Sequence, residues 1–162
     1  MLVRPATKDD LAFLRSMLYE ASCWRPGDRR LPENVFAESN VARYLAGWGR
    51  FGDQAVVAEE GGELVGAAWY RLFRSEEPGY GFVGDNVPEL TVGVETKARG
   101  RGVGEALLTE LIRIARVAGY SSLSLSVEPA NDRAVRLYRR CGFIDVGTNK
   151  GAVTMRLDLQ SS

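Results

Sequence analysis

The sequence predicts a mixed α/β (α+β) fold, in which a mostly antiparallel sheet of about seven strands is flanked by four helices. The first supporting observation is length, since 162 residues suffice for one core and residues 1–162 are expected to form a single domain. The second is composition, because 45% apolar and 26% charged residues are typical of a globular protein. The third is periodicity, which gives the order β-α-α-β-β-β-α-β-α-β-β. This order favours an antiparallel sheet with one parallel crossover and helices on both faces.

The first third of the chain is expected to supply one strand and two helices. Residues 1–7 have the pattern of a short strand, and Thr7 with Asp10 forms a capping-box pattern at a helix start. Apolar residues then recur at helical spacing from Leu11 to Leu18. After a proline-containing loop, a second helix is expected from about Pro32 to Gly47.

The rest of the chain is expected to supply six strands and two helices. Gly61-Gly62 forms a turn pair between two β-rich runs. Gly93 lies inside a later strand and indicates either a bulge or the close approach of another group to the backbone. The expected elements are a hairpin over residues 54–73, a strand over 89–96, a helix after Gly102, a strand over 121–127, a helix over 131–141 and a hairpin over 143–159.

Histidine is absent from the sequence, and Cys23 and Cys141 are the only two cysteines. These absences exclude histidine-based catalytic triads, His-ligated zinc and cysteine-rich metal sites, so no metal is expected. The 21 basic and 21 acidic residues balance, which argues against a nucleic-acid partner. No apolar run approaches the ~20 residues that span a bilayer, and the start lacks the pattern of a signal peptide. We therefore expect a cytoplasmic protein without membrane association.

The stretch "ARGRGVGEALL", residues 98–108, places glycines and arginines where a strand leads into a helix. The free N–H groups of a first helical turn favour an anion, and glycines let it approach the backbone. Arg99 and Arg101 add positive charge. The stretch lacks the P-loop pattern, and it fails the dinucleotide pattern because Glu105 or Leu107 occupies the third glycine position. The stretch alone indicates either another kind of anion site or a flexible turn.

Two motifs in the right order decide between these alternatives. "VGVETKARGRGVGEALL" and "LSLSVEPANDRAVRLYRRCGF" closely resemble the two core motifs of the GNAT superfamily of N-acetyltransferases. The first contains R-x-x-G-x-G from Arg99 to Gly104, and the second contains Asn131, Ala134, Leu137-Tyr138 and Gly142-Phe143. The resemblance covers roughly residues 90–147. It implies a splayed sheet and acetyl-coenzyme A (acetyl-CoA) as cosubstrate, with the pyrophosphate on the glycine turn.

The resemblance also implies parts for individual residues. The backbone of Val92 to Val94 would pair with the pantetheine arm like an added strand, with Gly93 at the break of the sheet. Asn131 would contact the cofactor, and Tyr138 would lie near its sulfur. The implied cofactor-binding residues are Val92, Gly93, Val94, Arg99, Gly100, Arg101, Gly102, Val103, Gly104, Glu105, Asn131 and Tyr138.

Acetyl transfer to an amine needs a base, an acid and an oxyanion donor. An amine with a pKa of ~10.4 is mostly protonated at pH 7, so a base assists it. Glu89 is our first choice of base, acting directly or through water, and Asp85 and Glu128 are the alternatives. Tyr138, with a reference pKa of ~10, suits protonation of the departing thiolate. The Val94 N–H would stabilise the oxyanion, as in the family.

The main hypothesis is an N-acetyltransferase that moves the acetyl group of acetyl-CoA to a primary amine by direct attack in a ternary complex. The acceptor would be a small-molecule amine or a peptide amine. A non-catalytic acyl-CoA-binding or sensing module is one alternative, and a basic nucleic-acid module is another that zero net charge disfavours.

Three further expectations concern the surface and the core. The final hairpin could pair two copies in a homodimer. Cys141 is expected to be an inert, packed thiol. A solvated outer helix face is expected for Arg133, Arg136, Arg139 and Arg140.

Overall fold

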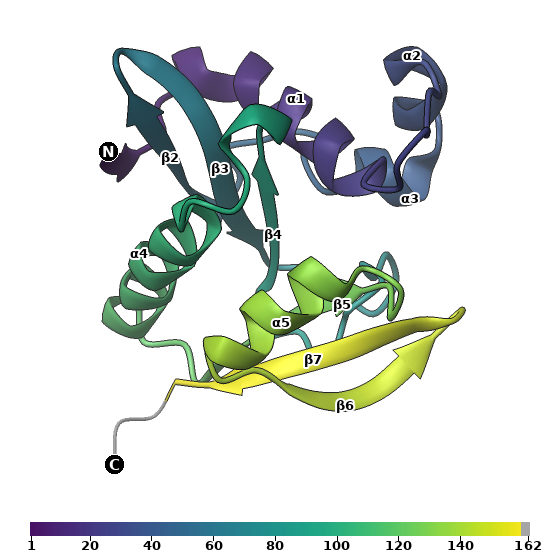
Figure 1. Ribbon diagram of the computed structural model, residues 1–162. Coiled ribbons are helices and arrows are strands. Elements are labelled where there is room, and N and C mark those ends of the chain that lie inside the picture. The colour runs from purple at the N-terminus through teal and green to yellow at the C-terminus, as the bar shows by residue number, and fades with distance from the viewer. Residues whose placement is uncertain (160–162) are drawn as a thin grey trace.

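The computed structural model describes residues 1–159, in which seven strands form one sheet with the order β1-β2-β3-β4-β5-β7-β6 (Figure 1). All neighbouring strands run antiparallel except β4 and β5, which are joined by the crossover through α4. The strands are β1 (Leu2–Pro5), β2 (Gln54–Glu60), β3 (Glu63–Arg71), β4 (Glu89–Val94), β5 (Ser122–Val127), β6 (Ile144–Asn149) and β7 (Ala152–Asp158). The predicted fold class is confirmed.

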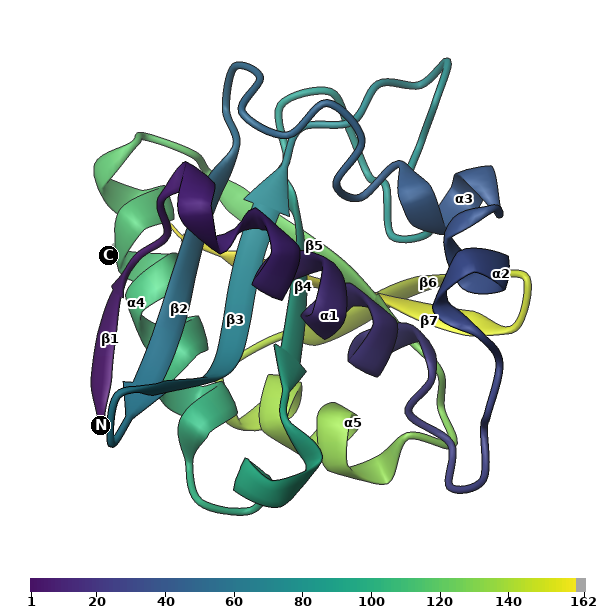
Figure 2. The same cartoon turned by 90° about the horizontal axis from the view of Figure 1, so that it is seen from above.

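Helices cover both faces of this sheet. Those of the described chain are α1 (Leu11–Ser22), α2 (Pro32–Phe36), α3 (Ser39–Ala42), α4 (Val103–Val117) and α5 (Asp132–Arg140). Figure 2 shows α1 lying across β3 and β4 on one side, with α4 on the other side. The α1 side buries Leu14, Met17 and Trp69, whereas the α4 side buries Leu107 and Leu111. Each amphipathic helix thus has its own core against one face of the sheet.

The start of α1 is capped as the sequence predicts. The Asp10 carboxylate accepts the Thr7 N–H at 2.8 Å, and the Thr7 hydroxyl accepts the Asp9 N–H at 3.3 Å. These bonds cap a short 3₁₀ turn, Lys8–Asp10, that leads into the helix. Arg4 from β1 also pairs with Asp10 at 2.9 Å, which ties this turn to the edge of the sheet.

The single helix predicted from Pro32 to Gly47 is wrong, because the segment forms two short helices and then turns. Glu38 between them is extended, with φ −78° and ψ 118°. The backbone carbonyls that follow accept tertiary bonds: Arg71 donates to Arg43 and Ala46 at 2.9 and 2.6 Å. Bonds from the sheet therefore replace the helical bonds that the local pattern favours.

Strands β4 and β5 diverge soon after they meet. Their only paired register position is Glu89 with Ser124. Gly93 does not mark a bulge, because β4 stays in regular register with β3 as far as Val94. Instead, a Cβ at Gly93 would lie 2.5 Å from the Met17 carbonyl oxygen, so the glycine allows α1 to approach the strand. The close approach is confirmed and the bulge is not observed.

Candidate active site

A cleft of about 940 Å³ opens where β4 and β5 separate. Its walls come from α1, β4, the turn before α4, the β5–α5 connection and α5. Among the predicted site residues, those that line it are Glu89, Val92, Gly93, Val94, Arg99, Gly100, Gly102, Val103, Gly104, Glu105, Asn131 and Tyr138. The fold therefore brings nearly the whole predicted set into one cavity.

The turn before α4 is built to present free amides. Gly100 and Gly102 have φ of 77° and 82°, a left-handed conformation that side chains other than glycine rarely adopt. The first N–H with a helical partner is that of Ala106, which donates to the Gly102 carbonyl at 3.1 Å. No side chain caps the helix. The amides of residues 103–105 therefore remain available for an anion at the positive end of the helix dipole.

The two arginines of this turn differ in direction. Arg99 lines the cleft, where it donates to the Val94 carbonyl at 3.2 Å and pairs with Glu20 at 3.3 Å. Arg101 does not line the cleft, because its guanidinium pairs with Glu60 of β2 at 2.7 Å. Arg99 therefore carries the side-chain charge that faces an anion on this turn.

The backbone of β4 has unpaired groups on the cleft side. The Glu95 N–H donates to the Val65 carbonyl of β3 at 2.8 Å. Because ladder bonds alternate along an antiparallel pair, the Val92 and Val94 amides point the other way, toward the space left by β5. An extended ligand arm can pair with them as a strand would.

Helix α5 forms the wall on the α4 side of the sheet. Asn131 is its N-cap, and its side-chain oxygen accepts the Ala134 N–H at 3.3 Å. Tyr138 is 7% exposed and meets Phe143 edge-on, with ring centroids 6.0 Å apart. Burial raises the pKa of Tyr138 above its ordinary value of 10, so the hydroxyl keeps its proton at neutral pH.

All four α5 arginines are exposed, as expected, but they do not share one outer face of the helix. Arg133, Arg136 and Arg140 line the cleft, which follows from their i, i+3, i+7 spacing on one side of the helix. Arg139 points elsewhere and pairs with Asp145 at 3.3 Å. Within residues 1–159, Arg133 and Arg136 have no carboxylate within ion-pair distance. The cleft therefore has two uncompensated positive charges on this wall.

Glu89 lies on the opposite face of the sheet from Tyr138 and is 2% exposed. The Tyr44 hydroxyl donates to its Oε2, whereas Oε1 has no partner among the described residues. Burial raises the pKa of Glu89 from 4.5 to about 7, against the lowering effects of the Tyr44 hydrogen bond and of the nearby Gly81 backbone N–H. A carboxyl with this pKa in a cleft is suited to exchange protons near neutral pH.

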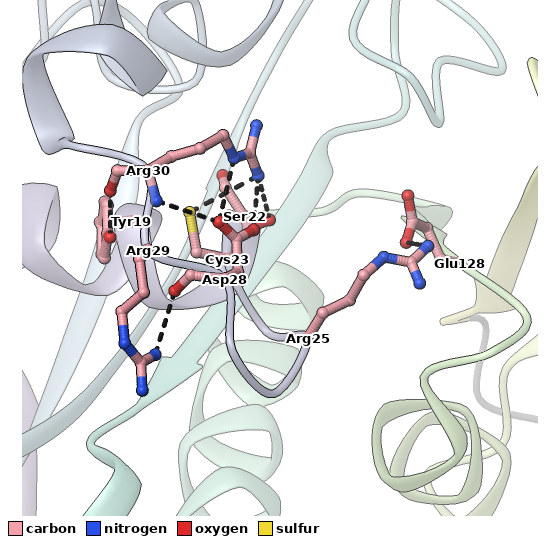
Figure 3. Close-up of polar contacts among 8 residues, drawn as sticks. All are labelled: Tyr19, Ser22, Cys23, Arg25, Asp28, Arg29, Arg30 and Glu128. Carbon is pink, nitrogen blue, oxygen red and sulfur yellow. Dashed lines mark hydrogen bonds and ion pairs between the residues drawn. The ribbon is translucent and has the colours of Figure 1, made fainter.

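The two alternative acids have other partners. Asp85 does not line the cleft and accepts the Ser75 N–H at 3.3 Å. Glu128 lines the cleft but pairs with Arg25 at 2.6 Å (Figure 3). Both carboxyls lie in more exposed surroundings than Glu89.

The Arg25–Glu128 pair joins two loops across the cleft. Figure 3 shows Arg25 reaching from the loop after α1 toward Glu128, while Arg30 holds the same loop through Asp28 at 2.9 Å and the Cys23 sulfur at 3.6 Å. This pairing was not predictable from the sequence, because the partners are 103 residues apart. The role of Tyr44 was not predictable either, because no local motif distinguishes it from a core aromatic.

The remaining predictions concern Cys141, Trp69, metal binding and membrane association. Cys141 is partly buried, and burial raises the pKa of its thiol. Trp69 lies in the α1-side core. No cluster of three or more His, Cys, Asp or Glu side chains in residues 1–159 could hold a metal ion. Each helix in that range is too short or too polar to cross a bilayer.

A family model described as the acetyltransferase (GNAT) family matches residues 16–143. This chain belongs to the GNAT family. The predicted resemblance is confirmed, and with it acetyl-CoA as the cosubstrate that the family uses. L-amino acid N-acyltransferase MnaT from Escherichia coli is 30% identical to this GNAT chain, over 93% of the chain and 87% of the relative.

Mycothiol acetyltransferase from Propionibacterium freudenreichii is 36% identical over 59% of the chain, and the match covers 29% of the relative. The chain thus spans less than a third of that relative's length.

Solved structures agree with the family assignment. A ribosomal-protein-alanine N-acetyltransferase from Brucella melitensis has a TM-score of 0.71 and 30% identity, over 98% of this chain and 99% of that one. The yncA structure from Salmonella typhimurium, solved with its cofactor acetyl-CoA, has a TM-score of 0.72 and 28% identity, over 100% and 95%.

Proposed function

We propose that this GNAT chain is an N-acetyltransferase that transfers the acetyl group of acetyl-CoA to a primary amine by direct attack in a ternary complex. The observation that supports this proposal most directly is the set of groups that line the cleft. One side of it combines the open α4 turn, the free β4 amides and Tyr138, and the other contains the buried Glu89 carboxyl. A donor and an acceptor could therefore enter from opposite faces of the sheet and meet where β4 and β5 part.

The donor would be bound by backbone more than by side chains. The amides of residues 103–105 and the Arg99 guanidinium suit the pyrophosphate. The Val92 and Val94 groups suit the amides of the pantetheine arm. The Val94 N–H would also donate to the negative charge that develops on the thioester oxygen during attack.

Proton transfer would use both sides of the cleft. Above about pH 7 Glu89 is ionised and can take a proton from the ammonium form of the acceptor. Five residues separate Glu89 from Val94, roughly 16 Å along an extended strand, so this transfer would pass through water. Tyr138, which keeps its proton, would protonate the departing thiolate from the α4 side.

The acceptor would be a small-molecule amine or the N-terminus of a peptide. Two relatives are named for such acceptors, the L-amino acid N-acyltransferase MnaT and the N-alpha-acetyltransferase RimI of Mycobacterium tuberculosis, and a third relative is named for mycothiol. MnaT aligns over most of both chains, so L-amino acids are the first class to test. We also propose a cytoplasmic location, in keeping with the unpaired Cys23 and Cys141. Pairing of two copies through the final hairpin stays a prediction.

The test is thiol release from acetyl-CoA over a panel of L-amino acids, peptides with a free N-terminus and polyamines. We expect release that depends on the amine, with the acetylated product identified by mass spectrometry. Thermal stabilisation by CoA is measured in parallel. Stabilisation without transfer to any amine would favour a binding module, and no stabilisation would argue against any acyl-CoA function.

A further inference from the structure

We propose that Tyr44 is a positioning residue for this reaction: its hydroxyl holds the Glu89 carboxyl in one orientation and stabilises the charged form. The inference rests on the proposed function, in which Glu89 is the base. Tyr44 lies outside both GNAT motifs, in the turn that follows α3. It is 8% exposed, and it lines the same cleft as Glu89.

The backbone around Tyr44 is fixed from the sheet. The Trp69 indole N–H donates to the Tyr44 carbonyl at 3.2 Å. Arg71, also on β3, donates to the carbonyls on either side, those of Arg43 and Ala46. Side chains of one strand thus bind three carbonyls within four residues, which leaves the ring of Tyr44 little freedom.

Arg71 is itself held in place. It is fully buried and pairs with Asp53 through two bonds, at 2.9 and 2.7 Å. Arg71 lies opposite Glu89 in the register of β3 and β4, but the Arg71 guanidinium forms its ion pair with Asp53. Arg71 therefore helps to place Tyr44, and no guanidinium in residues 1–159 pairs with Glu89.

The Tyr44 hydroxyl makes two hydrogen bonds, one as an acceptor and one as a donor. It accepts the Tyr80 N–H at 2.9 Å and donates its single proton to Glu89 Oε2. Because the amide occupies a lone pair of the phenol oxygen, the O–H is directed at the carboxylate. A Cβ at Gly79 would collide with Glu89 Oε1, so the adjacent loop packs directly on the carboxyl.

This arrangement leaves one carboxylate oxygen for chemistry. Oε1 is buried without a partner, and so is the hydroxyl of Ser124, the register partner of Glu89 on β5. Buried polar atoms in native proteins are rarely unpaired, and such pairs often mark a site for water or a ligand. A water here would link the acceptor amine to Oε1, while Tyr44 occupies Oε2.

Two titratable groups that line the cleft with Glu89 have partners of their own. On α1, Glu20 pairs with Arg99, and in the loop before β4 the Tyr80 hydroxyl bonds to Asn40. Among the described residues, Tyr44 is the side chain that donates to the Glu89 carboxyl. Its hydrogen bond lowers the pKa of Glu89, opposing the effect of burial.

The decisive variant is Tyr44→Phe, which keeps the ring and removes the hydroxyl. We expect the midpoint of the Glu89 titration to rise by about one pH unit, because the variant loses a hydrogen bond to the charged carboxylate. The midpoint is read from ¹³C NMR of glutamate-labelled protein, with the Glu89 signal assigned by its absence in Glu89→Gln. The acid limb of the pH–rate profile should shift by the same amount, with activity reduced several-fold at pH 7 and recovering by pH 9. The affinity for CoA should not change.

Tyr70→Phe is the matched control, since it removes a buried phenol hydroxyl that has no partner among the described residues and that lies in the α4-side core, away from Glu89. It should leave the midpoint unchanged. An unshifted Glu89 midpoint in folded Tyr44→Phe overturns the inference, whatever the activity. If the midpoint shifts but Glu89→Gln keeps the wild-type rate profile, Glu89 is not the base, and the proposed mechanism and the positioning role fall together. A lower rate at every pH without a shifted limb would show a merely structural role.

Discussion

Tyr138 combines two properties that an acid for the departing thiolate needs. Its ring is fixed by burial against Phe143, and its hydroxyl is protonated at neutral pH, although the burial that raises its pKa also makes it a weaker proton donor than a free phenol. We predict that Tyr138→Phe lowers kcat by about a hundredfold, in the range for loss of a general acid. CoA affinity should stay near that of the wild type, because the apolar ring remains. Steady-state thiol release and calorimetric titration with CoA check these outcomes, and full turnover in the variant would remove Tyr138 from the role.

At the level of single residues, the sequence could place the motif residues but not their directions. Arg99 and Arg101 lie in the same glycine-rich turn, yet one faces the cleft and the other pairs with Glu60. Tyr44 has no local signal, since its importance comes from a contact with a strand 45 residues away. Such directions depend on tertiary partners, which spacing along one segment does not encode.

The positive charge on the cleft-facing side of α5 is expected to strengthen CoA binding. Arg133 and Arg136 lack carboxylate partners in the described part of the chain, and they lie along the wall that leads to the α4 turn. We predict that the double variant Arg133→Gln/Arg136→Gln weakens CoA binding about tenfold, because charge-assisted bonds to phosphate are lost. The loss should shrink at high salt. Calorimetric titration at two salt concentrations measures both effects.

Arg139→Gln is the control on the same helix, because Arg139 pairs with Asp145 and does not line the cleft. It removes one positive charge, half the change in the double variant, but should leave CoA affinity near the wild-type value. A loss of binding free energy half as large as in the double variant would mean that α5 acts only through net charge.

Elements were predictable where their determinants are local. The α4 turn needs glycines at left-handed positions, and both Gly100 and Gly102 occupy them. The Thr7–Asp10 cap is likewise a contact within one turn. The break between α2 and α3 was not predictable, because bonds from β3 side chains stabilise the turns beyond it. The local pattern favours a helix there, and the tertiary bonds outweigh it.

On the scale of the whole molecule, the buried carboxyl of Glu89 couples folding to pH. In the unfolded chain its pKa is near 4.5, and in the folded protein it is about 7. The folded state therefore binds the proton more tightly, so this group destabilises the protein progressively as pH rises from about 4.5 to about 7, and by a constant amount above. The full shift corresponds to about 3 kcal/mol of unfolding free energy.

We predict that Glu89→Gln is more stable than the wild type at pH 8.5 and that the gain falls to about 1 kcal/mol at pH 5. Gln is similar in shape and has no charge to bury, whereas the wild type must hold an anion between the sheet and the Tyr44 turn. Denaturant unfolding at the two pH values, compared in both proteins, measures the difference. The same substitution should abolish the acid limb of the rate profile, so stability would rise where activity is lost. An equal stability difference at both pH values would show that Glu89 does not titrate as its burial requires, and it would remove the physical basis for a base at this position.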